Sequence, residues 1–221
     1  MCPNCLSLER HRLCCLYFKK TINKDVPLKL LHFAPEKFME TFFRSHKNIE
    51  YLSVDFKKGA AMQIADIINL PFKNKTFDFV YCSHVLEHIE DDLRAMREIK
   101  RVLTPKGIAI LQVPIADKDD TFEDFTITNP DEREKIFGQK DHVRRYGRDY
   151  TKKLTKAGFQ VEQIYFCKEI GEEATRRFAL LPNNGKCTPT EGVIFKCKKP
   201  RLNLTEEEPR GPTLLTSSSS L

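Results

Sequence analysis

The chain has no long hydrophobic run, and this absence excludes several classes of protein. No apolar stretch approaches the roughly 18 residues of a membrane-spanning helix, so the sequence predicts no membrane span. The apolar run from Leu13 to Phe18 is too short for the core of a signal peptide, and Lys19 and Lys20 follow it. We therefore expect a cytoplasmic protein that is not secreted.

The sequence has no tryptophan and only nine glycines in 221 residues, yet its 16 phenylalanines and 40% hydrophobic content can fill a core. Such a composition excludes a wholly disordered chain, and the length fits one full domain with small extras. Cys82 and Cys197 fall in strand-like apolar runs. The eight cysteines are therefore expected to be reduced thiols rather than a disulfide framework.

The net charge is a mild +6, from 37 Lys and Arg against 31 Asp and Glu. Basic residues are mixed with acids along the chain, so the sequence gives only weak support for a nucleic-acid partner. Nothing in the sequence indicates the oligomeric state.

Three segments differ in pattern. Residues 1–20 hold two cysteines near the start and a basic amphipathic stretch that predicts a helix. Residues 26–199 carry alternating strand-like and helix-like runs and are predicted to form the main domain. Residues 200–221 have no periodicity and many Glu, Pro and Ser residues, so we expect a disordered tail.

The main domain is predicted to be an α/β fold with a mainly parallel sheet, because strands alternate with helices. The predicted strands are 28–33, 49–54, 61–64, 77–82, 108–113, 160–166 and 191–198. Three helices are predicted: one that begins at Pro35, one over about residues 92–103, and one over about residues 150–157. Ligands of such sheets bind at the carboxyl ends of the strands.

Asp55 closes the second predicted strand, 21 residues after Ala34 at the first strand end. An acid at about this separation accepts hydrogen bonds from ribose hydroxyls in nucleoside-binding α/β folds. A carboxylate offers two acceptor oxygens to the two hydroxyls of the diol. Asp55 therefore indicates a nucleoside site, although an Asp can also simply end a strand.

The first strand turn, Ala34-Pro35-Glu36, argues against a phosphate-bearing cofactor. It has no glycine, Pro35 has no N–H to donate, and Glu36 would repel a phosphate. S-adenosylmethionine (SAM) fits better, because it has no phosphate and its ammonium group can bind Glu36. The alternative is that Glu36 only complements the dipole of the following helix.

Several motifs occur in order along the chain. They are Ala65-Asp66-Ile67, Leu70-Pro71-Phe72, Phe77-Asp78-Phe79-Val80, Ser83-His84-Val85-Leu86-Glu87-His88, and Arg97-Glu98 with Arg101-Val102-Leu103. Over about residues 28–166 the chain closely resembles the class I SAM-dependent methyltransferases, in particular their type 11-like domain. The resemblance implies a Rossmann-like three-layer sandwich, with a seven-stranded, mainly parallel sheet whose last strand is antiparallel.

The resemblance also implies roles for the strand-end residues. By position, Asp55 would bind the ribose, Asp66 the adenine amino group, and Ile67 would lie beside the adenine. Ser83 and His84 would lie near the methionine portion and the sulfonium. The turn at Ala34, Pro35 and Glu36 resembles a subgroup of the family and completes the predicted cofactor site.

Two motifs raise the question of a metal, although we predict no metal ligands. His84-Val85-Leu86-Glu87-His88 matches the inverted zinc-peptidase motif H-x-x-E-H, but a predicted strand runs directly into His84. Cys2 and Cys5 have zinc-knuckle spacing, but a zinc site needs four ligands. In the resembled subgroup a further cysteine pair lies upstream, so this segment could be the second half of a zinc ribbon.

The loop from Phe137 to Gly147 is expected at the acceptor side of the site. His142 is the candidate catalytic base, because the pKa of imidazole lies near neutral pH. Arg144 and Tyr146 are candidates for orienting the acceptor. The alternative is that the loop is a surface turn packed on the next helix. In the first segment, Arg10 or Arg12 could bind an anion.

Together these features predict a SAM-dependent methyltransferase with SAM as its cofactor. The acceptor, a small molecule or a macromolecule, is not identified by the sequence. The alternatives are a SAM-binding module without turnover, favoured by the glycine-poor turn, and a nucleic-acid-binding module on the same fold.

Overall fold

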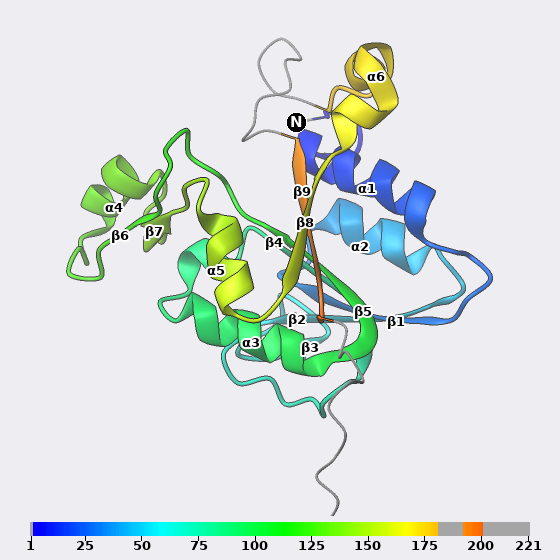
Figure 1. Ribbon diagram of the computed structural model, residues 1–221, viewed down its shortest axis with the longest axis horizontal. Coiled ribbons are helices and arrows are strands. Elements are labelled where there is room, and N and C mark those ends of the chain that lie inside the picture. Colours follow the sequence, from blue (N-terminus) through cyan, green and yellow to red (C-terminus); the bar gives the residue numbers. More distant parts are fainter. Residues whose placement is uncertain (1, 181–191, 201–221) are drawn as a thin grey trace, which may run out of the picture.

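Seven strands form one sheet in the computed structural model, which describes residues 2–180 and 192–200. The strands are β1 Leu28–Phe33, β2 Ile49–Asp55, β3 Gln63–Ile64, β4 Phe77–Ser83, β5 Leu103–Gln112, β8 Gln160–Tyr165 and β9 Val193–Lys198. Their order is β3-β2-β1-β4-β5-β9-β8 (Figure 1). Only the pairs that β9 makes with β5 and β8 are antiparallel. The mainly parallel sheet with an antiparallel last strand is thereby confirmed.

Helices cover both faces of this sheet. They are α1 Glu9–Thr21, α2 Lys37–Arg44, the short 3-10 helix η1 Leu86–His88, α3 Asp92–Val102, α4 Pro130–Phe137, α5 Tyr150–Lys156 and α6 Phe166–Arg177. Figure 1 shows α1 and α2 on one side of the sheet and α3 and α5 on the other. The three-layer sandwich is therefore also confirmed.

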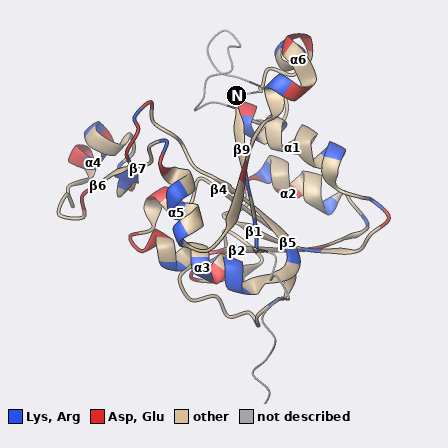
Figure 2. Ribbon diagram, viewed as in Figure 1, with Lys and Arg blue, Asp and Glu red and all other residues tan. Residues whose placement is uncertain are grey.

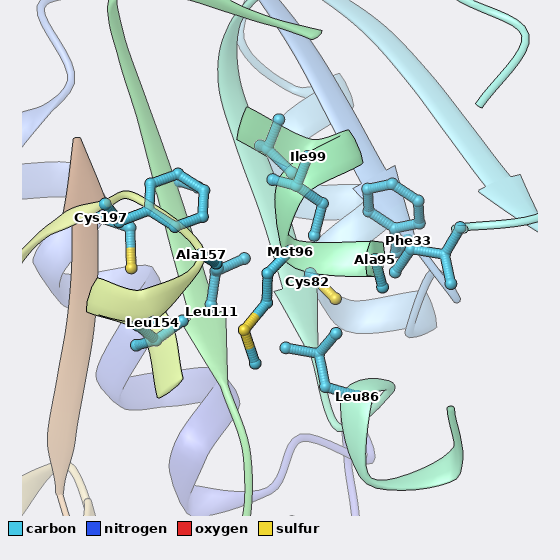
Figure 3. Packing of buried hydrophobic residues seen from close by; sticks show 14 of the residues in the cluster. Phe33, Cys82, Leu86, Ala95, Met96, Ile99, Leu111, Leu154, Ala157 and Cys197 are labelled. Atoms are coloured by element: carbon cyan, nitrogen blue, oxygen red, sulfur yellow. The ribbon is translucent and has the colours of Figure 1, made fainter. Parts of the chain in front are cut away.

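The core consists of two clusters, one on each face of the sheet. Leu30 belongs to one cluster and Leu31 to the other, because successive residues of a strand point to opposite faces. On the α3 and α5 side, Met96 and Ile99 pack toward the sheet (Figure 3). On the other side, Phe18 of α1 is fully buried. The predicted N-terminal helix therefore packs into the core of the sheet.

Several predicted boundaries differ from the structure. Strand β5 begins at Leu103, directly after α3, whereas the prediction left a turn over 104–107. Phe77 of β4 pairs with Leu103 and Phe79 pairs with Ile108, so the extra residues 104–107 form a bulge in β5. Pro105 has no N–H for a ladder bond and is tolerated at such a bulge. The third strand covers only Gln63–Ile64, and Pro35 precedes the helix that it was expected to begin.

The stretch after β5, expected to be a polar loop, contains regular structure. Strands β6 (Phe122–Glu123) and β7 (Arg144–Arg145) pair, and α4 lies between them. Helix α4 has strong sequence signals: Asn129 caps it, Pro130 is its first residue, and Gly138 ends it in the left-handed conformation. Helix α6 was not predicted. The tail predicted to be disordered lies beyond residue 200, outside the described residues.

Two further observations concern the described part of the chain. Cys2, Cys5, Cys14, Cys15, Cys82 and Cys197 are free thiols, and the last four of these are buried. No helix in residues 2–180 and 192–200 is long and apolar enough to cross a membrane.

Phe18→Ala tests whether α1 belongs to the core. The Phe18 ring centroid lies 5.2 Å from those of both Phe43 and Phe79, so truncation leaves a cavity. We expect the free energy of unfolding to fall by about 3–5 kcal/mol in urea denaturation. Lys19→Ala, an exposed position of the same helix, should change it by less than about 0.5 kcal/mol. Equal stabilities of the two variants would show that α1 is not docked.

Candidate functional site

A cavity of about 470 Å³ lies at the carboxyl ends of β1, β2 and β4. We call it the strand-end cavity. It is lined by Phe33, Ala34, Val54, Asp55, Phe56, Lys57, Ala65, Asp66, Ile67, His84, Val85, His88, Ile89 and Asp141. Its volume is in the usual range for a small-molecule site. Five of the predicted cofactor residues line it: Ala34, Asp55, Asp66, Ile67 and His84.

Backbone amides orient both predicted nucleoside carboxylates. Asp55 Oδ1 accepts a hydrogen bond of 2.7 Å from the N–H of Lys57, and Asp66 Oδ1 accepts one of 3.0 Å from Ile68. The cavity also has apolar surface, from Ile67 and from Phe56, whose side chain is 78% exposed. Two fixed acceptors beside apolar surface suit a nucleoside, which has hydroxyl and amino donors and a flat ring.

The residues that follow β1 and β4 have a left-handed backbone conformation although neither is glycine. Ala34 has φ +45° and His84 has φ +56°. This conformation costs on the order of 1 kcal/mol for a residue with a Cβ, and such residues cluster at functional sites. The turn after β1 therefore adopts, with alanine, a backbone conformation that usually requires glycine. Both Ala34 and His84 line the strand-end cavity.

Glu36 was predicted to bind the SAM ammonium group. In the structure its carboxylate instead pairs with two histidines of the protein. Its carboxylate lies 3.0 Å from Nε2 of His32 and 3.4 Å from Nε2 of His11. Burial alone would raise the pKa of Glu36, but the hydrogen bonds and charges of these two histidines outweigh it and lower the pKa to about 2. Glu36, Pro35 and Ser83 line neither cavity of this region.

A second cavity, of about 530 Å³, shares His84 and His88 with the first. We call it the histidine cavity. It is lined by Arg10, His84, Glu87, His88, Pro114, Ile115, Ala116, Lys135, Phe137, Gly138, Gln139, His142, Arg144 and Arg145. Arg10, Lys135 and Arg145 make no ion pair with an acid among the described residues. The two cavities therefore adjoin. Acids outnumber Lys and Arg in the lining of the strand-end cavity, and Lys and Arg outnumber acids in that of the histidine cavity.

His142, the predicted base, lines the histidine cavity and is only 4% exposed. Its Nδ1 lies 3.2 Å from the carbonyl oxygen of Phe137, and this contact makes Nδ1 the donor. Nε2 is then the acceptor, and it is buried without a hydrogen-bond partner in the described part of the chain. Burial, followed by the charge of His88, lowers the pKa of His142. The ring is therefore in a form that can accept a proton or bind a cation.

Arg144 and Tyr146, predicted to orient the acceptor, bind the protein itself. The guanidinium of Arg144 donates to the backbone oxygens of Leu86, Ile89 and Glu90. It also lies 2.9 Å from the Glu123 carboxylate. The Tyr146 hydroxyl donates to Asp92 at 2.7 Å. Both side chains hold the turn that contains η1 in place.

The two candidate arginines of α1 differ in position. Arg12 donates hydrogen bonds to the backbone oxygens of Ser7, Phe178 and Ala179, so it ties α1 to the end of α6. Arg10 lines the histidine cavity, and its Nε has no hydrogen-bond partner among the residues described. Of the two, only Arg10 is placed to meet an anion in the site.

Sequence reasoning missed Phe56, Glu87, His88 and Asp141 as site residues. Phe56 had a usable signal, since it is an apolar residue directly after the strand-ending Asp55. Glu87 and His88 belong to the H-x-x-E-H motif, which here spans a strand end and a 3-10 turn rather than one long helix. Cys2 and Cys5 gain no third ligand within residues 2–180 and 192–200.

Comparisons with known proteins agree with this geometry. Residues 30–111 match the family described as Methyltransferase domain. Among curated relatives, a protein of Methanocaldococcus jannaschii is 47% identical over 75 residues, which are 33% of this chain and 33% of that protein. A tRNA U34 carboxymethyltransferase of Campylobacter hominis is 32% identical over 92 residues, 42% of this chain and 30% of that protein.

The Bacillus subtilis protein YcgJ, a methyltransferase by name, is similar in sequence and in structure. It is 28% identical over 109 residues, 49% of this chain and 38% of YcgJ. Its crystal structure superposes with a TM-score of 0.54 at 17% identity, covering 86% of this chain and 99% of that one.

The aligned segment spans about a third of the length of the first curated relatives, 33% and 30%. The family match and the fold agree on one class. That class is the class I SAM-dependent methyltransferases, which residues 30–111 resemble in sequence and the sheet resembles in fold, and SAM is the cofactor of that class.

Glu36→Gln tests the interaction with the two histidines. Because the pKa of Glu36 is lowered to about 2, its carboxylate stabilises the native state above the unfolded pKa of about 4.3. That contribution, on the order of 3 kcal/mol, is lost as the pH falls from about 4.3 through about 2. Unfolding measured against pH should therefore show a smaller acid loss in the variant. Glu50→Gln, at an exposed carboxylate, should behave like the parent.

Arg144→Lys tests whether the guanidinium fork holds the η1 turn. Lysine keeps the charge but cannot reach three backbone oxygens at once. Because the side chain is 1% exposed, we expect a loss of about 2–4 kcal/mol in the free energy of unfolding. The neighbouring Arg145→Lys, on an exposed side chain, serves as the control. A parent-like stability of Arg144→Lys would assign the turn's position to other contacts.

Proposed function

We propose that this protein is a SAM-dependent methyltransferase that methylates an acceptor carrying a negatively charged group. The observation that carries the proposal is that two cavities of opposite charge adjoin at His84 and His88. A methyl transfer needs a donor and an acceptor held in contact, and two cavities that share a wall provide that arrangement.

The strand-end cavity is the proposed SAM site. Asp55 would hold the ribose hydroxyls, Asp66 the adenine amino group, and Phe56 and Ile67 would contact the adenine ring. When bound, SAM supplies a sulfonium methyl group that is open to attack by a nucleophile. The carboxylates of Asp55, Asp66 and Asp141 also favour a cationic ligand over an anionic one in this cavity.

The histidine cavity is the proposed acceptor site. Arg10, Lys135 and Arg145 give it a positive wall, and arginine binds carboxylate and phosphate groups with two parallel hydrogen bonds. His142 lies deeper, next to His88. Its buried Nε2 is the group of this chain placed to accept a proton or to hold a cation near the acceptor.

Two broader expectations accompany the proposal. The buried free thiols of Cys14, Cys15, Cys82 and Cys197 are typical of a reducing compartment, which supports a cytoplasmic location. Figure 2 shows Lys and Arg interspersed with Asp and Glu on the outer helices in this view. This mixture favours a small anionic acceptor over a long nucleic-acid footprint, which would need a continuous basic surface.

Asp55→Asn should weaken SAM binding by roughly 1–3 kcal/mol, because the ribose hydroxyls lose a charged acceptor. Isothermal titration with SAM measures this change directly. Asp78→Asn is the matched control, since Asp78 lies on β4 and lines neither cavity. Unchanged SAM affinity in Asp55→Asn would remove Asp55 from the site.

Incubation with methyl-labelled SAM and fractionated cell extract tests the reaction itself. Label should enter an acidic small-molecule fraction, and Arg10→Ala should reduce the incorporation while SAM affinity stays within about twofold. Tight SAM binding without transfer to any fraction would instead indicate a binding module. Label that enters only RNA or protein would contradict the small anionic acceptor.

A further inference from the structure

Glu87, His88 and His142 converge at the inner end of the histidine cavity. Each offers one potential ligand atom, and these three atoms lie within 4.8 Å of one another. Two of the residues come from the turn after β4 and one from the loop after α4, so the fold rather than the local sequence brings them together. The rings of His88 and His142 meet edge to face, with centroids 4.6 Å apart.

The cluster contains acceptors that lack donors. Glu87 is 1% exposed, and neither of its carboxylate oxygens has a hydrogen-bond partner among the described residues. Nε2 of His142 is likewise buried and unpartnered. Nδ1 of His84 lies 3.2 Å from Oε1 of Glu87 but makes no hydrogen bond with it. Buried acceptors without a hydrogen bond raise the free energy of the native state. A cation between them would remove that cost.

The outer nitrogens of both rings are fixed as metal-binding histidines usually are. Nδ1 of His142 lies 3.2 Å from the Phe137 carbonyl oxygen, which directs the lone pair of Nε2 into the cluster. Nδ1 of His88 lies 3.3 Å from Oδ2 of Asp141. A carbonyl or carboxylate behind each imidazole orients the ring and increases its basicity toward a metal.

We propose that Glu87, His88 and His142 bind a divalent first-row transition-metal cation. Two imidazoles and one carboxylate match the ligands that Zn²⁺ and Mn²⁺ accept, and three protein ligands leave a position open toward the cavity. Ligand atoms of such a site lie about 3.3–3.5 Å apart, given metal–ligand bonds of about 2.0–2.1 Å. Small side-chain rotations close the present spacing to that value.

The charged neighbours are compatible with a cation. Nδ1 of His84 lies 3.2 Å from Oε1 of Glu87 and contacts that carboxylate from the side of the strand-end cavity. The Arg144 guanidinium is occupied by three backbone oxygens and by Glu123 and Asp92. Arg10 and Arg145 line the wall, where an anionic acceptor would separate them from the metal.

The role of this metal rests on the proposed function. A cation held by these residues would lower the pKa of a bound acceptor hydroxyl, so its proton could pass to solvent water near neutral pH. The resulting alkoxide would form an O–C bond with the sulfonium methyl as the S–C bond breaks, and S-adenosylhomocysteine would leave. His142 then acts as a metal ligand, and the open metal position, rather than a free imidazole, activates the acceptor.

Metal uptake by the full chain tests the site. Every protein carries Cys2→Ser and Cys5→Ser, so that those thiols cannot take up zinc, and each is first dialysed against EDTA. Zn²⁺ and Mn²⁺ are then titrated separately by calorimetry, and the bound metal is measured after gel filtration. The variants are Glu87→Gln and His142→Gln, with His46→Gln, which lines neither cavity, as the matched control.

The parent and His46→Gln should bind one equivalent of at least one of the two cations, and binding should raise their melting temperatures. Glu87→Gln and His142→Gln should bind it at least tenfold more weakly. Asp141→Asn, which removes the carboxylate behind His88, should weaken binding by about 10–100-fold. If a buried variant fails to fold, His88→Asn, at a partly exposed position, is compared in its place.

Absence of stoichiometric uptake by the folded parent would overturn the proposal, and so would equal uptake by parent and folded variants. SAM titration of the same samples separates the two proposals. Intact SAM binding without metal uptake rejects only the metal site, whereas loss of SAM binding in the parent rejects the proposed function.

Discussion

The buried guanidinium of Arg144 fixes the geometry on which both cavities depend. At 1% exposure its charge must be compensated, and it is, by Glu123, by Asp92, and by the backbone oxygens of Leu86, Ile89 and Glu90. Those oxygens belong to the turn between β4 and α3. Arg144 therefore ties the loop after α4 to the carboxyl end of the central strand, and a backbone hydrogen bond from Val143 to the Glu87 oxygen extends the tie. His142 reaches Glu87 and His88 because this contact holds its loop in place.

The two cavities differ in the sign of the charged side chains that predominate in their linings. Asp55, Asp66 and Asp141 line the strand-end cavity, whereas the histidine cavity has a wall of Arg and Lys side chains. A cationic cofactor and an anionic acceptor would each be drawn to its own side. His84, held in a left-handed conformation at the end of β4, lies on the shared wall where donor and acceptor would meet. Strain of about 1 kcal/mol at this residue is the local cost of placing an imidazole there.

The sheet and the position of Asp55 and Asp66 in the strand-end cavity could be predicted because their signals are local. Asp55 and Asp66 each follow an apolar strand, and a parallel sheet brings such strand ends together. The partners of Glu36 could not be predicted in this way. His11 lies on another element, and only the docking of α1 brings it within 3.4 Å of that carboxylate. The same holds for His142, whose partners Glu87 and His88 are distant in sequence. The sequence indicates both the H-x-x-E-H motif and His142, but only the fold shows that His142 contacts Glu87 and His88.

A crystal structure with bound S-adenosylhomocysteine tests the central claim most directly, since it shows which cavity holds the cofactor. We expect the nucleoside in the strand-end cavity, with the ribose hydroxyls on the Asp55 carboxylate, the adenine against Ile67, and the sulfur directed toward His84. Density for the nucleoside in the histidine cavity, or a ribose that makes no contact with Asp55, would contradict it.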